Sequence, residues 1–540
     1  MTGSGSARAA QIARVVVPLG FLAVFFVWPL LAIFGHSLRP GAIADVVADP
    51  ALRQVAWFTF WQAVVSTLLT LVVGLPAAYV VARYDFRGRR LFRAFVTVPF
   101  VLPTVVVATA FLALLRPGGP LAFLHWQRGV APMLVAHVFF NLAVVVRTVG
   151  GFWANLDPRR EEAARMLGAS RARAFREVTL PLLAPSIIAA ASIVFLFTFT
   201  SFGVVLLLSD PAHATLEVEI YRQAIELFDL QTAAALALVQ IVAVLIVVFG
   251  LARAQERRGI AQQLVGAEDA ARRPRGRERL VVGVILGATT LFLGLPLVLL
   301  VWRSLHVGGE WSLAAYRALG SSSSTSTLFV SPWVAVRNSV EFAVIATVIA
   351  LVVGGLASVV IAARPGRATR SMDAFLMLPL GVSAVTVGFG FLLAFQHVPN
   401  DLATSPLLVP IAHAVIAIPF VIRAVVPALR SIDPRLRDAA TMLGAGPRRV
   451  WREVDLPITR RAFAVAAGFC AAVSLGEFGA TLFVARPDWP TVPIAIQRFL
   501  ARPGEINVDQ ARAMSVILML LTIVIVFAIE RVRLRDLGEF

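Results

Sequence analysis

The sequence predicts an all-α polytopic membrane protein with about twelve transmembrane helices, arranged as two parallel-repeated six-helix halves. The composition is the first observation: 59% of the 540 residues are hydrophobic and only 15% are charged, whereas a soluble domain has about 25% charged residues. Several apolar runs also exceed the ~18 residues that mark a membrane-spanning helix. The third observation is a polar segment that occurs twice, starting at Glu162 and again at Asp438.

The apolar runs fall into two sets of six. We expect each run to form a helix, because lipid cannot satisfy the hydrogen-bonding groups of an open backbone. The expected spans are approximately 12–34, 57–82, 94–115, 131–149, 182–208 and 231–252, followed by 280–302, 337–363, 374–396, 406–428, 459–484 and 511–530.

A charged stretch without hydrophobic periodicity separates the two sets and is typical of a linker. The predicted domains are therefore a first six-helix half at 1–252, a cytoplasmic linker at 253–279 and a second half at 280–540. The halves repeat in detail, since Thr67–Gly74 parallels Thr347–Gly354. An even number of spans in each half predicts a parallel repeat, related by an axis along the membrane normal.

Arginine counts predict the orientation. The segments 83–93, 155–181 and 253–279 carry five, six and eight arginines, and they alternate with arginine-poor segments. Cytoplasmic loops are the ones enriched in basic residues. Both termini, the linker and both copies of the polar segment are therefore expected on the cytoplasmic side of the membrane.

Several function classes are disfavoured by the residues present. The net charge of +18 is concentrated in short loops, where membrane topology explains it better than a nucleic-acid partner does. The single Cys470 excludes disulfides and cysteine-based metal sites. The sequence contains no GxxxxGK[ST] phosphate-binding loop, so we expect no enzymatic activity, no cofactor and no metal in this chain.

The repeated segment reads EAARMLGASRARAFREVTLP in the first copy and DAATMLGAGPRRVWREVDLP in the second. An Asp-Pro pair precedes each copy, which is typical of a capped helix start, and Gly168 and Gly444 predict a sharp turn at the helix end. We expect a second short helix to carry the arginines and to be broken before the next span by Leu180-Pro181 or Leu456-Pro457. The alternative is an ordinary amphipathic connector, which two equivalent copies make less favoured.

The spacing of E-A-A, G and L-P resembles the EAA loop of ATP-binding-cassette (ABC) importer permeases, and the resemblance extends over nearly the whole chain. It implies a type I importer-like fold, in which this loop is the helix that couples the permease to its ATPase. The coupling residues that the resemblance implies are Glu162, Ala163, Ala164, Gly168, Leu180 and Pro181 in the first copy and Asp438, Ala439, Ala440, Gly444, Leu456 and Pro457 in the second.

The resemblance also implies partners and a mechanism. Two copies of a separate ATPase subunit, which use ATP and Mg, would dock on the two loops, and an extracytoplasmic binding protein would deliver the substrate. The chain itself would be the permease, which opens alternately to each side of the bilayer.

The substrate is less specified. Fusion of two halves resembles the thiamine and iron(III) permeases, and segments such as SFGVVLLLSDPAHATLEVEIYRQAI from Ser201 are closer to the thiamine permeases. We therefore expect thiamine or its phosphates, with iron(III) as the alternative. Remote alternatives are a secondary transporter, which also uses two parallel halves, and an intramembrane enzyme or scaffold.

Four residues are candidates for the substrate pathway. Glu477 lies in an apolar run, where a charge costs about 2–3 kcal/mol or more, and could attract a cation; its counterpart in the first half is Ser201. Phe202 and Phe478 could form a gate. The alternatives are a structural carboxylate for Glu477 and core packing for the two phenylalanines.

His137 and His413 occupy matched places in two spans. The pairing suggests an iron or proton site, and symmetry-related helix packing explains it as well.

Overall fold

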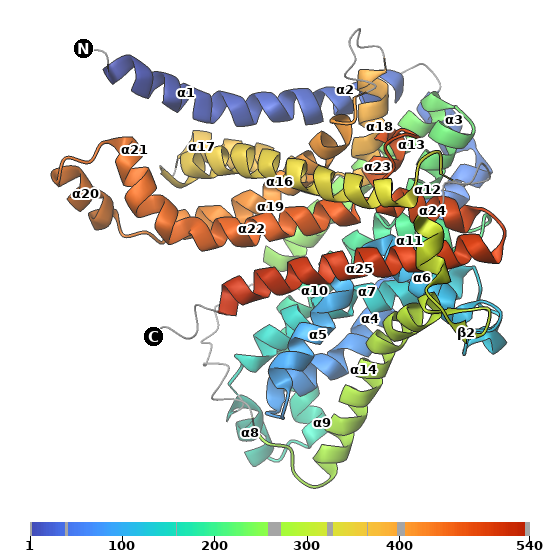
Figure 1. Ribbon diagram of the computed structural model, residues 1–540. Coiled ribbons are helices and arrows are strands. Elements are labelled where there is room, and N and C mark those ends of the chain that lie inside the picture. Colours follow the sequence, from blue (N-terminus) through green and yellow to red (C-terminus); the bar gives the residue numbers. More distant parts are fainter. Residues whose placement is uncertain are drawn as a thin grey trace. The chain divides into compact units, whose positions relative to one another are not determined.

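The structure is a computed structural model that describes residues 3–37, 42–157, 159–256, 272–320, 328–363, 366–396 and 405–534. Its elements are helices apart from the short strands β1 (His306–Val307) and β2 (Glu310–Trp311) (Figure 1). The all-α fold class is confirmed. Residues 257–271 of the predicted linker lie outside the described residues.

The chain forms two compact units. Unit 1 comprises residues 1–43, 220–238 and 307–540, and unit 2 comprises residues 44–219 and 239–306. The first helix of each half therefore packs with the other half: α1 (Gly3–Leu22) contacts α16 (Pro332–Ala363), and α14 (Arg277–Ser304) contacts α4 (Pro50–Arg83). The two packing units therefore do not coincide with the two halves of the sequence repeat. The repeat boundaries 1–252, 253–279 and 280–540 stay a prediction.

In unit 2, the long helix α4 contacts α7, α10 and α14. Short helices α3 (Ala42–Ala48) and α12 (Leu216–Tyr221), together with the long α13 (Leu230–Glu256), begin in one unit and end in the other. The remaining helices of unit 2 are α5 (Arg89–Val101), α6 (Thr104–Leu115), α7 (Val130–Ala154), α8 (Arg159–Met166), α9 (Arg171–Ala174), α10 (Leu180–Phe199) and α11 (Gly203–Leu208).

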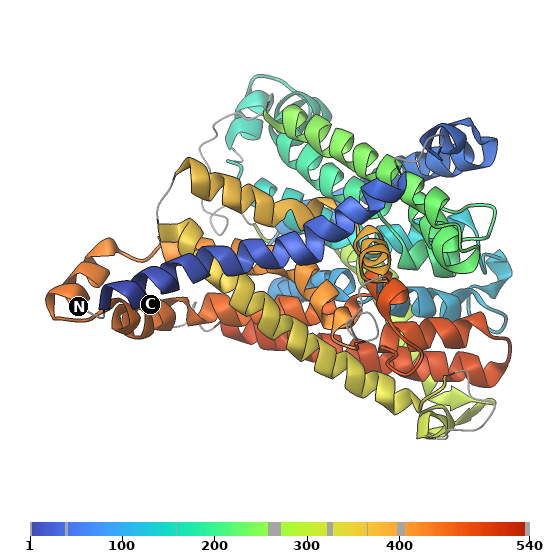
Figure 2. The same cartoon turned by 90° about the horizontal axis from the view of Figure 1, so that it is seen from above.

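Unit 1 repeats this order from α16 onward, and α1 packs against α16 (Figures 1 and 2). Its other helices are α2 (Trp28–Ser37), α15 (Ala314–Arg317), α17 (Arg367–Met377), α18 (Ala384–Phe395), α19 (Leu408–Arg430), α20 (Pro434–Met442), α21 (Pro447–Val450), α22 (Leu456–Gly476), α23 (Gly479–Val484), α24 (Val492–Ala501) and α25 (Glu505–Leu534).

Ten helices of the described chain are long and apolar enough to cross a membrane, or twelve if two bent helix pairs each count as one span. The bent pairs replace the straight spans expected at 94–115 and 374–396, and that expectation is wrong. The chain turns by 100° between α5 and α6 and by 97° between α17 and α18. Pro103 precedes α6 and supplies no backbone N–H to a helix that would continue from α5. The second break lies after the 3₁₀ turn Leu378–Gly381, where the Ser383 hydroxyl caps α18 by accepting a hydrogen bond from the N–H of Thr386.

In each unit, one of the close contacts between helices forms where glycine faces valine. A Cβ atom added to Gly74 of α4 would lie 2.8 Å from Cβ of Val145 on α7. The same 2.8 Å separates a Cβ on Gly354 of α16 from Cβ of Val421 on α19. Small residues at such contacts let membrane helices gain the close packing that holds them together.

We predict that Gly354→Ala and Gly74→Ala each lower the thermal stability of the purified protein. The added methyl group overpacks a filled contact, which costs about 1–3 kcal/mol. Unfolding of the protein in detergent, followed by intrinsic fluorescence, measures the effect. Gly20→Ala and Gly287→Ala are matched controls in α1 and α14, where no atom lies within 4 Å of the new Cβ. Equal Tm values for all four variants would contradict the packing argument.

Candidate functional site

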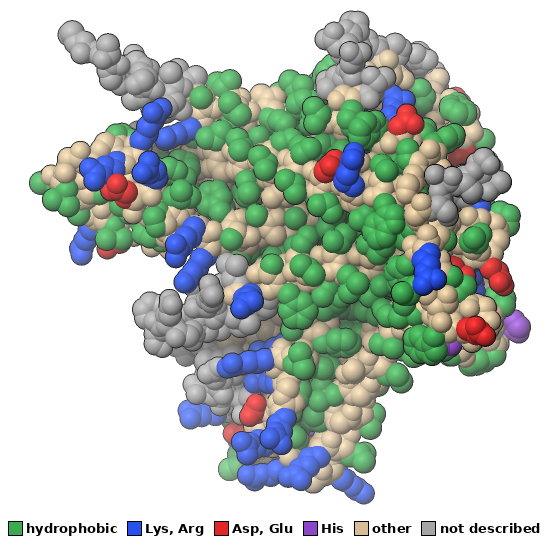
Figure 3. Space-filling view, viewed as in Figure 1, with side chains coloured by type: hydrophobic (Ala, Val, Ile, Leu, Met, Phe, Trp, Pro, Cys, Tyr) green, Lys and Arg blue, Asp and Glu red, His purple; other side chains and the backbone are tan. Residues whose placement is uncertain are grey.

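The two copies of the repeated polar segment fold into the same helical hairpin, which we call the coupling hairpins. The first comprises α8, α9 and a π-helical segment, Phe175–Thr179, that leads into α10; the second comprises α20, α21 and the π-helical segment Trp451–Asp455, which leads into α22. The second hairpin projects beyond the end of α22, and arginine side chains gather on it (Figures 1 and 3).

Each hairpin begins with the expected acidic cap. The Asp433 carboxylate accepts a hydrogen bond of 2.9 Å from the backbone N–H of Arg435 at the start of α20. The Asp157 carboxylate accepts one of 3.0 Å from the N–H of Arg159 at the start of α8. These bonds satisfy backbone donors that a helix start leaves free, as the Asp-Pro pairs predict; Pro158 itself lies outside the described residues.

The turn glycines adopt the conformation that their position predicts. Gly168 has φ +90° and Gly444 has φ +82°, a region that favours glycine. The N–H groups of Ala169 and Ala445 donate to the carbonyls of Ala164 and Ala440 at 3.1 and 3.0 Å. This is the Schellman arrangement of a helix C-terminus, which reverses the chain within two residues.

The expected break before the next span does not occur. Helix continues from Arg171 to Phe199 and from Pro447 to Gly476, although Pro181 and Pro457 stand at the start of α10 and α22. Each proline directly follows a π turn, in which the N–H of Leu180 or Leu456 reaches five residues back, to Phe175 or Trp451. Because the hydrogen-bond register already changes there, the proline is accommodated without ending the helix.

The residues predicted to couple the hairpins to a partner lie largely on the surface. Glu162, Ala163 and Gly168 are exposed, as are Asp438, Ala439 and Gly444. Next to each turn stand two apolar side chains that the repeat also preserves but that the sequence analysis did not single out. Met166, Leu167, Met442 and Leu443 are 89%, 90%, 89% and 88% exposed. Apolar side chains this exposed, at equivalent places outside the membrane spans, are typical of surfaces that contact another protein.

The pathway candidates Ser201 and Glu477 have different surroundings in their two units. The Ser201 hydroxyl is hydrogen-bonded to His137 Nε2 at 2.9 Å. The Glu477 side chain is half-buried, and its carboxylate accepts a hydrogen bond of 2.9 Å from the N–H of Ala480 in the first turn of α23. Glu477 therefore caps a helix, as its structural alternative expects.

Phe202 and Phe478 are 6% and 2% exposed and stand directly before α11 and α23. This burial agrees with core packing, and the role of a gate stays a prediction for both residues.

The matched histidines are hydrogen-bonded through both ring nitrogens. His413 Nδ1 meets the Ser474 hydroxyl at 2.7 Å and its Nε2 meets the Thr481 hydroxyl at 2.8 Å. Because Thr481 donates its own proton to the Glu477 carbonyl, it accepts from Nε2–H, and Ser474 donates to Nδ1. His137 Nδ1 likewise meets Ser66 at 3.0 Å.

These bonds favour helix packing over iron binding, because the nitrogens that would ligate a metal are engaged. In the described part of the chain, no group of three or more His, Cys, Asp or Glu side chains could hold a metal ion.

Two buried carboxylates escaped the sequence analysis. Glu217 and Glu219 of α12 are 0% and 5% exposed, and Gln240 of α13, which is 1% exposed, donates a hydrogen bond to Glu217. They resembled ordinary outer-loop charges, since the segment 209–230 was expected to be a loop. Comparison of the repeats could have found them, because the equivalent positions are Pro493 for Glu217 and Val516 for Gln240.

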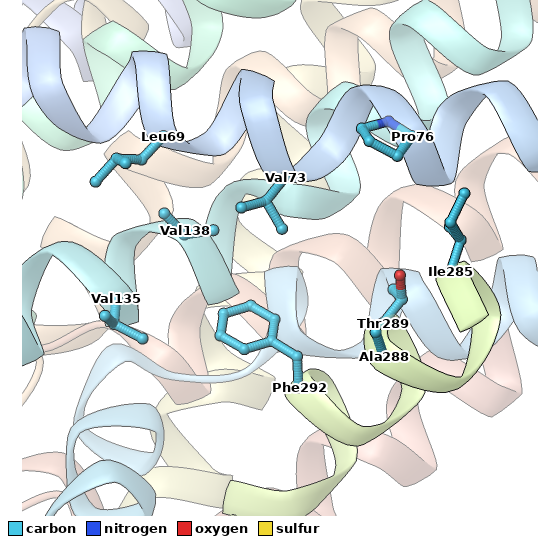
Figure 4. Close-up of a pocket in the computed structure, with 9 residues that line it drawn as sticks. All are labelled: Leu69, Val73, Pro76, Val135, Val138, Ile285, Ala288, Thr289 and Phe292. Carbon is cyan, nitrogen blue, oxygen red and sulfur yellow. The ribbon is translucent and has the colours of Figure 1, made fainter. Parts of the chain in front are cut away.

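Unit 2 also contains a pocket of about 430 Å³ between α4, α7 and α14 (Figure 4). Its lining is apolar except for Thr289, and it includes Val73, Val138 and Phe292. The pocket offers no carboxylate to a cation.

Ten to twelve apolar helices in the described chain, with the same exposed hairpin ahead of α10 and of α22, are the architecture of a membrane permease. The family of the binding-protein-dependent transport system inner membrane component matches residues 70–259 and 352–534. The chain belongs to this family, the permeases of ABC importers, and is a multi-pass inner-membrane protein. This assignment replaces the alternatives of a secondary transporter and an intramembrane enzyme.

Similar proteins extend over the whole chain. The thiamine transport system permease protein ThiP of Brucella abortus (strain 2308) is 28% identical over 95% of this chain and 94% of its own length. ThiP of Escherichia coli (strain K12) is 26% identical over 93% and 92%. The sulfate transport system permease protein CysT of Salmonella typhimurium is 33% identical, over 40% of this chain and 80% of its own length.

We predict that His137→Ala and His413→Ala destabilise the protein by about 1–3 kcal/mol each, because a buried hydroxyl loses its partner. Thermal unfolding in detergent measures this. Ferric ion added to the wild-type protein should leave its Tm unchanged. A ferric-dependent rise in Tm that both variants lose would instead support a metal site.

Proposed function

We propose that this chain is the membrane permease of a thiamine importer and that it works with two copies of a separate ATPase and an extracytoplasmic binding protein. The observation that carries the proposal is similarity to ThiP proteins along the full length of both chains, 95% of this one and 94% of the Brucella protein. CysT covers only 40% of this chain, so similarity to the sulfate permease reflects a single shared half.

The coupling hairpins are the proposed docking points for the ATPase. Each presents a Met-Leu pair at 88% to 90% exposure, and the two hairpins share the same cap, turn and π segment. Two equivalent apolar projections fit two copies of one partner that offers an apolar groove. ATP and Mg would be bound by that partner.

Transport would follow from differential affinity. An ATPase dimer that favours one arrangement of the hairpins shifts the permease toward it, and a shift from 1:99 to 99:1 requires about 5.5 kcal/mol. The hairpins continue without a break into α10 and α22, so their displacement is passed directly to two membrane spans. In this arrangement the hairpins and both termini face the cytoplasm, and the binding protein docks on the opposite side.

Thiamine carries a permanent positive charge, and Glu477 could attract such a substrate during transport. Its side chain is half-buried, and its carboxylate accepts a hydrogen bond from the backbone N–H of Ala480. Iron(III) is the weaker candidate, since both matched histidines are engaged by hydroxyl groups.

We predict that deletion of the gene abolishes high-affinity uptake of labelled thiamine and leaves uptake of labelled iron(III) unchanged. Both substrates are measured in parallel in cells with and without the gene, and re-expression of the gene provides the control. Loss of iron uptake alone would replace thiamine with iron(III), and loss of neither would remove both substrates from consideration.

We predict that Gly444→Ala lowers thiamine uptake about tenfold without loss of the protein from the membrane. An L-residue at φ +82° carries a strain of roughly 1–2 kcal/mol, which opens the hairpin turn. Gly446→Ala is the matched control: Gly446 lies two residues away, has φ −72° and has no atom within 4 Å of an added Cβ. Normal uptake by Gly444→Ala would contradict the assigned role of the turn, and Gly168→Ala repeats the test in the first copy.

A further inference from the structure

One side-chain pair ties each coupling hairpin to the span that follows it, at equivalent positions in the two copies. In the first copy the Thr179 hydroxyl donates a hydrogen bond of 2.9 Å to the Glu161 carboxylate. In the second copy Arg437 Nε donates to Asp455 Oδ1 at 2.7 Å. Each pair joins the first helix of a hairpin, α8 or α20, to the last residue of the π segment ahead of α10 or α22.

We propose that these two pairs are braces that transmit force from the hairpins to the membrane spans, with a hydroxyl–carboxylate bond in the first half and an ion pair in the second. Their four members would be positioning residues, which act through the hairpin and touch no substrate. The inference rests on the proposed coupling function of the hairpins.

Burial separates the braces from the other polar contacts of the hairpins. Thr179 is 3% exposed, and the Asp455 and Arg437 side chains are 13% and 35% exposed. Water screens such groups less than it screens surface charges. A bond at this depth can therefore hold a fixed geometry.

Two other ion pairs in the hairpins are neither buried nor placed between two helices. Arg173–Glu177 and Arg449–Glu453 occupy equivalent positions, with side chains 64% and 59% exposed in the first pair and 68% and 54% exposed in the second. Each joins residues one turn apart in the same continuous helix, and exposed pairs of this kind contribute little. They connect no two helices, so they are matched controls.

The second brace reaches a third element. Arg437 Nη2 also donates to the Leu429 carbonyl near the end of α19, at 3.3 Å. One guanidinium therefore connects α19, α20 and the start of α22. Without it, α20 would be joined to α22 mainly through the turn at Gly444 and the short helix α21. The brace therefore holds α20 and the start of α22 in a fixed arrangement, so that the two move together.

A distance measurement tests the second brace without any substrate. Nitroxide labels are placed at Thr441→Cys on α20 and Ile458→Cys on α22, in a Cys470→Ser background and in the full-length protein. We expect a narrow distance distribution that broadens in Asp455→Arg, where two arginines oppose each other. The double variant Arg437→Glu with Asp455→Arg restores opposite charges and should narrow the distribution again.

The second measurement is the number of ATP molecules hydrolysed for each thiamine molecule transported, in proteoliposomes with the ATPase and the binding protein. Asp455→Arg should raise this number by roughly fivefold or more at an unchanged Tm, and the charge-swapped double variant should restore it. In the first copy, Thr179→Val should raise it, and Glu161→Arg with Thr179→Asp, which installs the second copy's pair, should preserve coupling. Reversal of the exposed pair, Arg449→Glu with Glu453→Arg, should change neither readout.

Unchanged distances in Asp455→Arg would overturn the brace, as would a coupling loss that the double variant fails to restore. A fall in Tm that accounts for the whole coupling loss would also overturn it, by making the pair merely structural. Absence of thiamine transport by the wild-type protein would instead contradict the proposed function. The distance measurement would still decide the brace in that case.

Discussion

Each unit depends on one tight pair of helices, α4 with α7 in unit 2 and α16 with α19 in unit 1. Helices in lipid gain nothing from hiding apolar surface from each other, so close packing must supply the attraction. Glycine makes this possible where Gly74 meets Val145 and Gly354 meets Val421. The helix that leaves each coupling hairpin, α10 or α22, contacts both members of its pair. The helix that follows each hairpin therefore touches this close-packed pair directly.

Polar groups occupy equivalent positions in the two units, but the residues that form their hydrogen bonds differ. The N–H of Leu216 is held by the Thr59 hydroxyl and that of Val492 by the Ser339 hydroxyl, a conservative exchange. The histidines diverge further, because His137 uses Ser66 and Ser201 whereas His413 uses Ser474 and Thr481. Burial requires that a polar group find a partner, and it leaves open which helix supplies that partner.

Local features were predictable because a few adjacent residues determine them. Gly168 and Gly444 predicted their turns, and the Asp-Pro pairs predicted their caps. Apolar length predicted the spans, which number twelve in the described chain when each bent pair counts as one. The breaks between α5 and α6 and between α17 and α18 were missed, since apolar composition averages over a bend. Pro181 and Pro457 predicted helix breaks that do not occur, because a π turn before each proline lets the helix continue.

Long-range partners were beyond reach of the sequence. Nothing in the order of the spans says that α1 packs with α16, or that α14 packs with α4. The hydroxyl partners of the two histidines and the contact between Glu217 and Gln240 depend on the same tertiary packing. The internal repeat carries some of this information. When the two halves are aligned, Glu217 takes the position of Pro493, and this difference marks it as unusual.

The two hairpins share their exposed Met-Leu pairs but differ in the side-chain pairs that lie behind them. The Met-Leu pairs have nearly the same exposure in the two copies, as expected of surfaces that meet identical partners. Behind them, one copy is tied by Thr179 and Glu161 and the other by Arg437 and Asp455. In the proposed function, a symmetric partner would constrain the outer surface, whereas the inner tie needs only to be stiff. Each half is then free to adapt its spans to an asymmetric task, such as carrying a carboxylate at Glu477 opposite an uncharged Ser201.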